Sequence, residues 1–399
     1  MLEAMAVDRD GAGVEAADSP WWSRRRGELL ELANGATPLY VYDEETLRGS
    51  VGELRLLRAV ERVFYSVKAN AHPDVLGVLR GSGLGFECVS PGEVDHVLGQ
   101  FPDLEPQRVL FTPNFAPRGD YSRAFEAGVQ VTLDNVYPLG AWPEVFAGRD
   151  LLVRVDPGQG QGHHPYVRTA GHQSKFGVSP DQLKLIEGLA ATVRARIIGL
   201  HAHVGSGITD ADTWVETAKF LAGLAAALPD VRVLDLGGGL GVPEQPDEPA
   251  LDLPALATKL ETFRSATPQY ALWMEPGRYL VAEAGVLLTR VTQLKAKSGV
   301  RYVGVDAGMN SLLRPSLYGA RHAIVNLTRL GEPATIVAEI VGPICETADV
   351  LGSRRPLPAT EEGDVLLVAT AGAYGAVMGS RYNLREPAAE RLLPARGYA

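Results

Sequence analysis

The sequence predicts an α/β protein, a (β/α)8 TIM barrel followed by a C-terminal antiparallel β-barrel or sandwich domain. Two observations lead to this prediction. Eight short apolar runs alternate with amphipathic stretches between residues 62 and 275, which is typical of parallel strands joined by helices. After Gly277, short apolar runs are separated by turns with little room for helices, which indicates antiparallel strands. An open doubly wound sheet is the alternative for the first part.

The chain of 399 residues starts with a segment rich in Ala, Gly, Asp and Glu, and we expect residues 1–20 to form a mobile tail. Residues 21–32 contain two tryptophans and three arginines, and they are predicted to form a short helix that docks on the body. A short strand over 39–42 precedes the barrel and could pair into the second domain. The expected division is a tail and short helix over 1–35, a barrel over 36–280 and a β domain over 281–399.

The barrel strands are expected where apolar, β-branched and aromatic residues form continuous runs. These runs are 62–67, 85–89, 108–112, 129–133, 151–156, 197–204, 231–236 and 271–275. The amphipathic stretches between them, which we expect to be helical, include 91–99, 180–189, 210–228 and 253–265. The strands expected in the second domain are 286–294, 302–306, 322–327, 334–341 and 365–369.

The composition excludes several classes of function. A net charge of −10, from 48 acidic and 38 basic residues, disfavours nucleic acid or an anionic membrane as the main partner. No apolar run is long enough to span a membrane, and the first 35 residues contain no apolar signal core. Cys88 and Cys345 are too few for a disulfide framework or a structural zinc site, and they fit a reducing cytoplasm. We expect a cytoplasmic protein without a metal, with Cys88 as a small core residue.

In a (β/α)8 barrel, reactive groups gather at the carboxyl ends of the strands. Lys68 follows the first predicted strand, so its amine is expected at this face. A lysine removed from water loses part of its proton affinity and can form a Schiff base with an aldehyde. Taken alone, a lysine at a strand end more often only extends its amine to the solvent.

Three other strand ends carry polar or glycine-rich motifs. His203 and Ser206 follow the sixth strand, three glycines at 237–239 follow the seventh, and Glu275 and Arg278 lie at the end of the eighth. Consecutive glycines let backbone N–H groups surround an anion, although tight turns use glycine too. His203 offers a flat ring, but a lone histidine is more often structural. A carboxylate at Glu275 needs a cationic partner, either Arg278 or a protonated pyridine nitrogen.

An amine nucleophile, a phosphate cradle, a flat ring and a buried carboxylate are the parts needed to hold pyridoxal phosphate. With these parts in place, the chain resembles the group IV, fold-type III pyridoxal-phosphate decarboxylases over nearly its whole length after the tail. Within that family it is most similar to the members that act on diaminopimelate. The motifs that carry the resemblance are 64–70, 203–207, 237–239, 275–278, 345–347 and 372–374.

The resemblance implies roles toward the cofactor. Lys68 would bind it covalently, His203 would stack on its ring, and Glu275 would bond the pyridine nitrogen. The residues that would hold the phosphate are Ser206, Gly237, Gly238, Gly239, Gly277, Arg278 and Tyr374. Glu87 and Glu93 match acidic positions that line the family's site, with a carboxylate at a helix start as the alternative for each.

The resemblance also implies a substrate with a second, distal carboxylate, which the planar fork of a guanidinium matches. The residues expected at the substrate are Arg278, Arg314, Tyr318, Glu346 and Tyr374. Glu346 would receive the distal ammonium, and Cys345 would act as the general acid. The family's head-to-tail homodimer implies that Cys345 and Glu346 complete the partner's site, so a monomer would be inactive.

The expected reaction is decarboxylation of meso-2,6-diaminopimelate to L-lysine and CO2, the last step of lysine biosynthesis. One departure keeps another substrate open, namely another acidic or carrier-protein-tethered amino acid. Residues 168–174 read Arg-Thr-Ala-Gly-His-Gln-Ser, which is similar to a kinase-fused diaminopimelate module and to relatives that act on tethered amino acids. Racemisation is disfavoured because the similar racemase places an arginine at the pyridine nitrogen. A non-enzymatic cofactor-binding protein is disfavoured because such proteins resemble the barrel alone.

Overall fold

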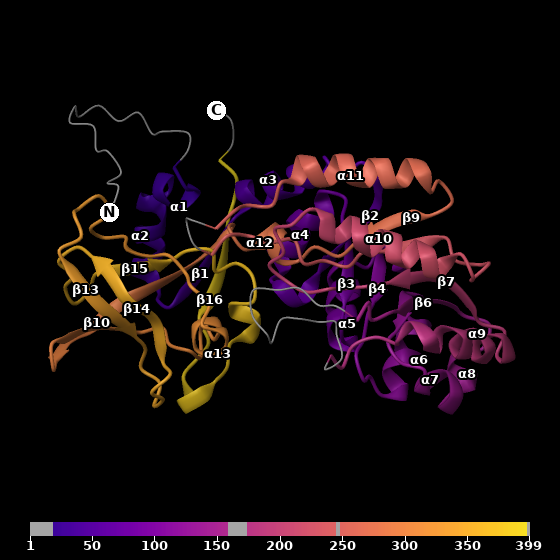
Figure 1. Cartoon of the computed structure of the whole chain (residues 1–399). Helices are drawn as coiled ribbons and strands as arrows, with labels where there is room; N and C mark the ends of the chain where they lie inside the picture. The colour runs from indigo at the N-terminus through magenta and orange to yellow at the C-terminus, as the bar shows by residue number, and fades with distance from the viewer. Residues whose placement is uncertain (1–18, 159–173, 245–247, 397–399) are drawn as a thin grey trace.

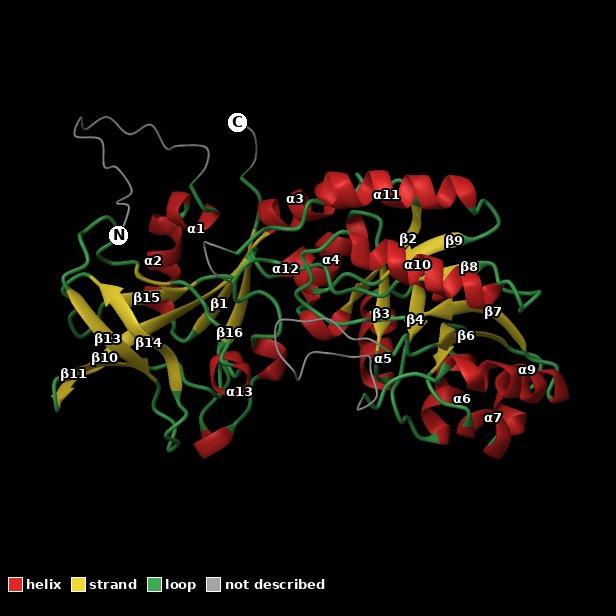
Figure 2. Ribbon diagram, in the orientation of Figure 1, coloured by secondary structure: helices red, strands yellow, loops and turns green. Residues whose placement is uncertain are grey.

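The computed structural model describes residues 19–158, 174–244 and 248–396. It contains a barrel body and a second body built on a twisted sheet, which lie side by side (Figures 1 and 2). Most of the expected tail and most of the 168–174 motif lie outside the described residues. In the part of the chain that is described, no helix is both long and apolar enough to cross a membrane.

Within the described residues, eight parallel strands form a closed barrel in chain order from β2 to β9. Closure comes from the first strand pairing with the last, with Val63 opposite Met274. The predicted (β/α)8 barrel is confirmed, and the open-sheet alternative is wrong. The strands are β2 (Val60–Ser66), β3 (Gly85–Cys88), β4 (Val109–Phe111), β5 (Gln130–Leu133), β6 (Asp150–Arg154), β7 (Arg196–His201), β8 (Val233–Asp235) and β9 (Ala271–Met274).

A layer of large apolar side chains fills the barrel interior below the carboxyl ends of the strands. Phe64, Leu110, Leu152 and Val233 come from β2, β4, β6 and β8, and Trp273 of β9 packs with them. Side chains from alternate strands commonly fill such a barrel in layers. The polar residues at the carboxyl ends therefore have a dry floor beneath them.

The helices on the outside of the barrel begin at sequence signals that cap them. Helix α5 (Pro91–Gln100) has proline in its first turn, and Ser90 Oγ accepts a hydrogen bond from Glu93 N. Helix α11 (Leu253–Ala266) is capped by Asp252 and buries an apolar stripe at 256, 260 and 263. The other barrel helices are α3 (Glu44–Leu54), α4 (Pro73–Gly81), α6 (Arg118–Glu126), α7 (Tyr137–Ala141), α8 (Pro143–Phe146), α9 (Leu183–Thr192) and α10 (Asp212–Ala225).

The second body is built around the long strand β10 (Gly285–Lys297), which pairs with β1, β11 and β15. The expected antiparallel arrangement holds for most pairs, but β11–β13 and β1–β16 are parallel, so the sheet is mixed. No short turn joins the strands of either parallel pair, so no hairpin fixes their direction. The strands are β1 (Leu39–Asp43), β11 (Val300–Val305), β12 (Ile324–Asn326), β13 (Ile336–Val341), β14 (Val350–Leu357), β15 (Val365–Val368) and β16 (Ala389–Leu393).

Two N-terminal helices, α1 (Trp21–Arg24) and α2 (Arg26–Gly35), dock on this sheet, where one short helix was expected over residues 21–32. Trp21 and Leu29 are buried in an apolar cluster with residues of β1 and β10. Arg25 forms a buried ion pair with Asp43, with 2.8 Å between Nη1 and Oδ1. The predicted strand at 39–42 also pairs with β10, as part of β1, so the chain before the barrel contributes to the second body.

Candidate active site

Lys68 lies in the 3-10 turn Val67–Ala69 that follows β2, at the carboxyl end of the barrel. Its Nζ is 2.5 Å from Oε2 of Glu87, which is fully buried on β3. Thr112, directly after β4, donates its hydroxyl to the other oxygen of Glu87. Glu87 is therefore held in place from two sides, and it holds the lysine amine in turn.

The turn that carries Lys68 is anchored to the last barrel strand and to the second body. Ser66 Oγ donates to the backbone oxygen of Glu275 over 2.9 Å. Tyr374 N donates to the backbone oxygen of Ala69 over 2.8 Å. Tyr374 has φ of 55°, a left-handed conformation that is rare for a tyrosine and is often found at functional sites.

The charge of Lys68 differs from the expectation for a desolvated amine. Burial lowers its pKa, but the electrostatic interaction with Glu87, followed by those with Tyr374 and Glu275, outweighs burial, so the net shift is upward. The expected loss of proton affinity is wrong for the protein alone, because the amine lies beside the buried carboxylate of Glu87. Lys68 is therefore an ammonium until its environment changes.

His203 follows β7 and presents a neutral ring. Burial lowers its pKa well below the ordinary value, and the charges of Arg154 and Lys68 lower it further. Its Nδ1 accepts a hydrogen bond from Gly238 N over 3.1 Å, so in the neutral ring Nε2 carries the proton. Gly238 thus fixes the tautomer of the ring.

The three glycines after β8 are required by close packing between strand-end loops. A Cβ on Gly238 would lie 2.2 Å from the backbone oxygen of Glu275, and one on Gly239 would lie 2.4 Å from that of Gly205. Gly237 and Gly239 also have positive φ values of 64° and 94°. These glycines were predicted to give an anion access to the backbone, and in the structure the neighbouring loops also leave no room for a side chain.

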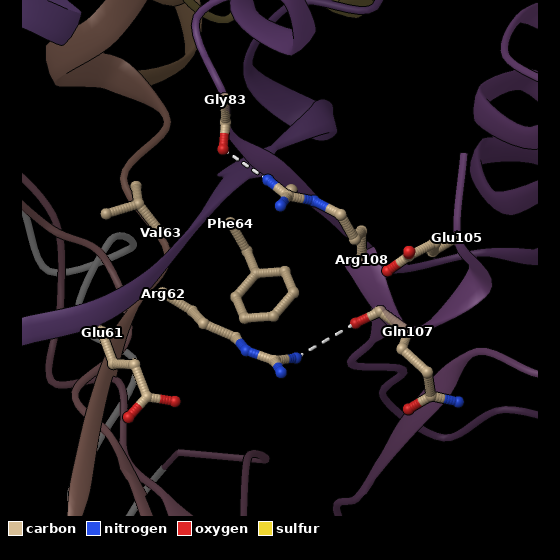
Figure 3. Close-up of a pocket in the computed structure, with 9 residues that line it drawn as sticks. Glu61, Arg62, Val63, Phe64, Gly83, Glu105, Gln107 and Arg108 are labelled. Atoms are coloured by element: carbon tan, nitrogen blue, oxygen red, sulfur yellow. Dashed lines mark hydrogen bonds between the residues drawn. The ribbon is translucent and has the colours of Figure 1, made fainter. Parts of the chain in front are cut away.

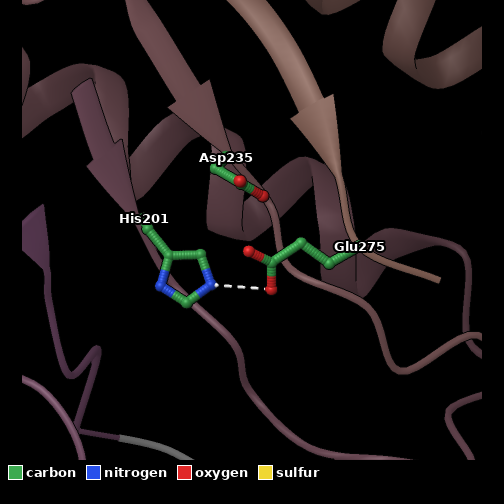
Figure 4. Close-up of side chains that lie close together, drawn as sticks. All are labelled: His201, Asp235 and Glu275. Atoms are coloured by element: carbon green, nitrogen blue, oxygen red, sulfur yellow. Dashed lines mark ion pairs between the residues drawn. The ribbon is translucent and has the colours of Figure 1, made fainter. Parts of the chain in front are cut away.

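A buried cluster of His201, Asp235 and Glu275 lies at the ends of β7, β8 and β9 (Figure 4). One side-chain nitrogen or oxygen of each residue lies within 4.8 Å of those of the other two, and His201 Nε2 is 3.3 Å from Glu275 Oε2. Burial alone would raise the pKa of Glu275, but His201, then Lys68 and His203, lower it to about 2. Burial and the charge of Glu275 raise the pKa of Asp235 well above its ordinary value. Glu275 is therefore ionised, and Asp235 is a neutral acid beside it.

His201, Asp235 and Arg154 were not predicted as site residues, although the first two lie in the expected strands 197–204 and 231–236. His201 lies two residues before His203, and side chains two apart on an extended segment point to the same side. That spacing was a usable signal for His201. Arg154, at the end of β6, is buried with its guanidinium 4.4 Å from the ring centroid of Phe176, and its Nε is 4.0 Å from Asp134.

Three of the residues expected at the phosphate lie together. Arg278 begins the short helix α12 (Arg278–Val281), and its Nε and Nη2 donate to Ser206 Oγ over 3.3 Å each. Its guanidinium carbon is 5.0 Å from the ring centroid of Tyr374. Burial, followed by the like charge of Arg314, lowers the pKa of Arg278. The site therefore has two guanidinium groups near each other.

Arg314 begins α13 (Arg314–Tyr318), and its side chain is only 3% exposed, unlike the surface arginine that its place before a proline would suggest. Nη1 lies 3.0 Å from His322 Nε2, and His322 Nδ1 lies 3.0 Å from the backbone oxygen of Ala369. Burial, followed by the charge of Arg314, lowers the pKa of His322 to about 4, so its neutral Nε2 accepts from the arginine. Nη2 donates to Glu244, which was not predicted as a site residue.

A cavity of about 270 Å³ opens beside Arg278 and Glu244. Its lining residues are Gly207, Thr209, Val242, Pro243, Glu244, Glu248, Pro249, Arg278, Tyr318, Gly319, Ala320 and Arg321. Tyr318, which was expected at the substrate, therefore lies near the arginines.

Glu93 lies at the start of a barrel helix, whereas Cys345 is exposed on the second body. Glu93 Oε2 accepts from Val89 N over 2.7 Å at the start of α5, so its hydrogen bonding is that of a helix-start carboxylate. Cys345 and Glu346 are exposed after β13. Glu346 accepts from Tyr382 over 2.5 Å, and no contact found among the described residues joins Cys345 or Glu346 to Lys68 in the same chain.

A second hollow, of about 250 Å³, lies at the opposite end of the barrel, where β2, β3 and β4 begin (Figure 3). Arg62 reaches the backbone oxygen of Gln107 over 3.4 Å, and Arg108 donates to that of Gly83. Active sites of such barrels lie at the carboxyl ends of the strands. We therefore assign the chemistry to the face that carries Lys68.

The barrel, the lysine at its carboxyl face, the neutral ring and the ionised carboxylate together define a pyridoxal-phosphate enzyme. The family described as "Pyridoxal-dependent decarboxylase, pyridoxal binding domain" matches residues 53–282, more than half of the chain. The chain belongs to this family of decarboxylases, and its cofactor is pyridoxal phosphate.

Individual relatives narrow the comparison. A diaminopimelate decarboxylase from Methanothermobacter thermautotrophicus is 38% identical over 386 residues, covering 92% of this chain and 89% of the relative. One from Neisseria meningitidis serogroup B is 37% identical, covering 91% and 89%. The crystal structure of diaminopimelate decarboxylase from Helicobacter pylori complexed with L-lysine has a TM-score of 0.84 at 29% identity, covering 92% of this chain and 94% of that chain.

Proposed function

We propose that this chain decarboxylates meso-2,6-diaminopimelate to L-lysine and CO2, the last step of lysine biosynthesis. The observation that carries the proposal is the buried guanidinium of Arg314 close to Arg278. A substrate with a single carboxylate at its reacting carbon would offer this guanidinium no second carboxylate to bind. A second, distal carboxylate supplies the planar anion that an arginine fork binds. The names of the relatives support the same substrate.

The residues at the carboxyl ends fit the cofactor chemically. Bound pyridoxal phosphate supplies an electron sink for the bond that breaks. In our proposal Lys68 binds the cofactor covalently, and the neutral ring of His203 packs on its face. Glu275, buried and ionised, would accept a hydrogen bond from a protonated pyridine nitrogen, while Asp235 remains neutral and adds no second charge. The residues proposed to hold the phosphate are Ser206, Gly237, Gly238, Gly239, Gly277, Arg278 and Tyr374.

Substrate binding and protonation are assigned to residues of two chains. Arg278, Arg314, Tyr318 and Tyr374 position the substrate in one protomer. Glu346 of a second copy receives the distal ammonium, and Cys345 of that copy donates the proton to the carbon that loses CO2. A homodimer is therefore part of the proposal.

Exposed apolar residues near Cys345 support a contact with a second copy. Cys345 N donates to Asn383 over 2.8 Å, and Leu384, the next residue, is 94% exposed. Tyr382 and Val377 are also exposed. Apolar groups of this kind are commonly covered by a partner. Both cysteines are free thiols, which agrees with the proposed cytoplasmic location.

The test is CO2 release by the cofactor-loaded protein with meso-diaminopimelate, L-ornithine, L-arginine and L-glutamate offered separately. We expect turnover of diaminopimelate alone. Turnover of ornithine or arginine in its place would refute the role of Arg314. No turnover of any of the four, with the cofactor bound at Lys68, would favour the alternative of another acidic or carrier-protein-tethered amino acid.

A further inference from the structure

Glu244, in the loop after β8, places its carboxylate directly on the arginine pair. Arg314 Nη2 donates to Glu244 Oε1, and the same oxygen is 4.0 Å from Arg278 Nη1. The other oxygen accepts from Arg321 N over 3.3 Å. One carboxylate of the chain therefore lies where two buried guanidinium groups approach each other.

The carboxylate of Glu244 offsets part of the positive charge that the two buried arginines place in the pocket. The side chains of Arg314 and Arg278 are 3% and 10% exposed, so water screens them poorly. Their mutual repulsion is one cause of the lowered pKa of Arg278. A carboxylate between them removes much of that repulsion.

The two arginines keep other contacts that do not depend on Glu244. Arg314 Nη1 is held by His322 over 3.0 Å, and Arg278 is held by Ser206 over 3.3 Å. Glu244 is more exposed than either arginine, at 17% of its side chain, and it lines the cavity that opens beside Arg278. Exchange of its carboxylate for that of a ligand would therefore leave both guanidinium groups in position.

We propose that Glu244 is an internal stand-in for the distal carboxylate of the substrate, which must displace it in order to bind. The identity of that substrate rests on the proposed function. Where the protein's own group occupies a site, the apparent affinity for a ligand falls by the fraction of time that the site is free. Glu244 thus sets the substrate concentration at which the site fills, and it takes no part in the bond-breaking step.

The experiment compares wild-type protein with Glu244→Gln, which keeps the size of the side chain and removes its charge. Both are loaded with cofactor and titrated by calorimetry with pimelate, a dicarboxylate without an amine. We expect pimelate to bind Glu244→Gln about tenfold more tightly. Cadaverine, which has two amines and no carboxylate, should not bind more tightly. Glu216→Gln, at an exposed position of α10, makes the same charge change away from the site and should match the wild type.

Kinetics gives a second readout that a merely structural role would not produce. With diaminopimelate, Glu244→Gln should lower KM by a similar factor while kcat changes by less than about twofold. Glu244→Ala, which cannot retain a hydrogen bond to Arg314, should change both readouts in the same direction. Equal or weaker pimelate binding to both variants, or no pimelate binding to any form, would overturn the proposal.

The two proposals can fail separately. If wild-type protein does not turn over diaminopimelate but pimelate binds Glu244→Gln more tightly, the proposed substrate is wrong and the stand-in role holds. If diaminopimelate is turned over but pimelate affinity and KM do not respond to either variant, the proposed function holds and Glu244 is only a structural ion-pair partner.

Discussion

Replacement of Arg314 by alanine tests how the site recognises a second carboxylate. The side chain is 3% exposed, and its Nη1 is held by His322, so the guanidinium is already positioned before a ligand arrives. Removing one partner of a buried, hydrogen-bonded charge pair costs about 2–5 kcal/mol of binding. At about 1.4 kcal/mol for each factor of ten, we expect KM for diaminopimelate to rise between about thirtyfold and about four-thousandfold.

The variant should still fold, because the groups left behind have alternatives. His322 is neutral at pH 7, since its pKa is lowered to about 4, and Glu244 is exposed enough to reach water. Arg314→Lys keeps the charge but loses the planar fork, so it should recover only part of the affinity. Arg301→Ala, at an exposed position of β11, is the matched control.

The assay is steady-state CO2 release together with the visible absorbance of the bound cofactor. The absorbance should be unchanged in all three variants, because Lys68 is not altered. A KM within about threefold of wild type in Arg314→Ala, with the cofactor still bound, would refute the reasoning, since a lost charge pair costs more than that.

Four further predictions test other parts of the site. Lys68→Ala should abolish both turnover and the absorbance of the covalently bound cofactor, whereas Lys184→Ala, at an exposed position, should preserve both. Asp235→Asn mimics the neutral acid. Its free energy of unfolding relative to that of the wild type should rise by up to about 1.4 kcal/mol per pH unit above about pH 4, the pKa of an unfolded Asp. Urea titrations at pH 5 and pH 7 measure this difference, and equal differences at the two pH values would contradict the prediction. Gly238→Ala places a Cβ 2.2 Å from the backbone oxygen of Glu275. The resulting overpacking should lower the free energy of unfolding by about 1–3 kcal/mol and weaken cofactor binding. Thermal unfolding with and without cofactor measures both effects. If sites are shared, inactive Lys68→Ala and Cys345→Ala proteins should regain activity when mixed and allowed to exchange subunits, and no recovery after verified exchange would argue against a shared site.

The sign of the Asp235 prediction follows from proton linkage. Its pKa is raised in the folded protein, so the folded state retains a proton that the unfolded state has lost above about pH 4. Wild-type stability therefore falls as pH rises from there toward the folded pKa. Glu275 behaves in the opposite way: its folded pKa of about 2 contributes stability that is present above the unfolded pKa and is lost as pH falls through the folded value.

The fold was largely predictable because barrel strands are buried on both faces. Continuous apolar runs therefore mark all eight of them, although the ends differ by a few residues. The strands β14 and β16 were not predicted, since Arg354, Arg355 and Pro356 interrupt the apolar pattern of the first, and the second reads Ala-Glu-Arg-Leu-Leu. Their assignment depends on pairing partners elsewhere in the chain, and a local pattern carries no information on those partners.

The candidate site was predictable where a residue stood in a recognisable motif at a strand end. Lys68, His203 and Glu275 lie at such ends, and the barrel brings them to one face. Glu244 could not be found in this way, because it lies in an acidic, proline-rich loop with no motif. Only the packing of α13 against that loop places its carboxylate on Arg314.

The sequence by itself determined the barrel, the face that carries the chemistry and the identity of the cofactor. These features could be predicted because apolar periodicity and strand-end motifs are local properties of the chain. The tertiary structure decided the charge states and the pairings. Glu87 is 19 residues from Lys68 and raises its pKa, and Glu244 is 70 residues from Arg314 and neutralises it. The physical reason is that an ionisable group responds to burial and to charges within a few ångströms, and folding alone sets both.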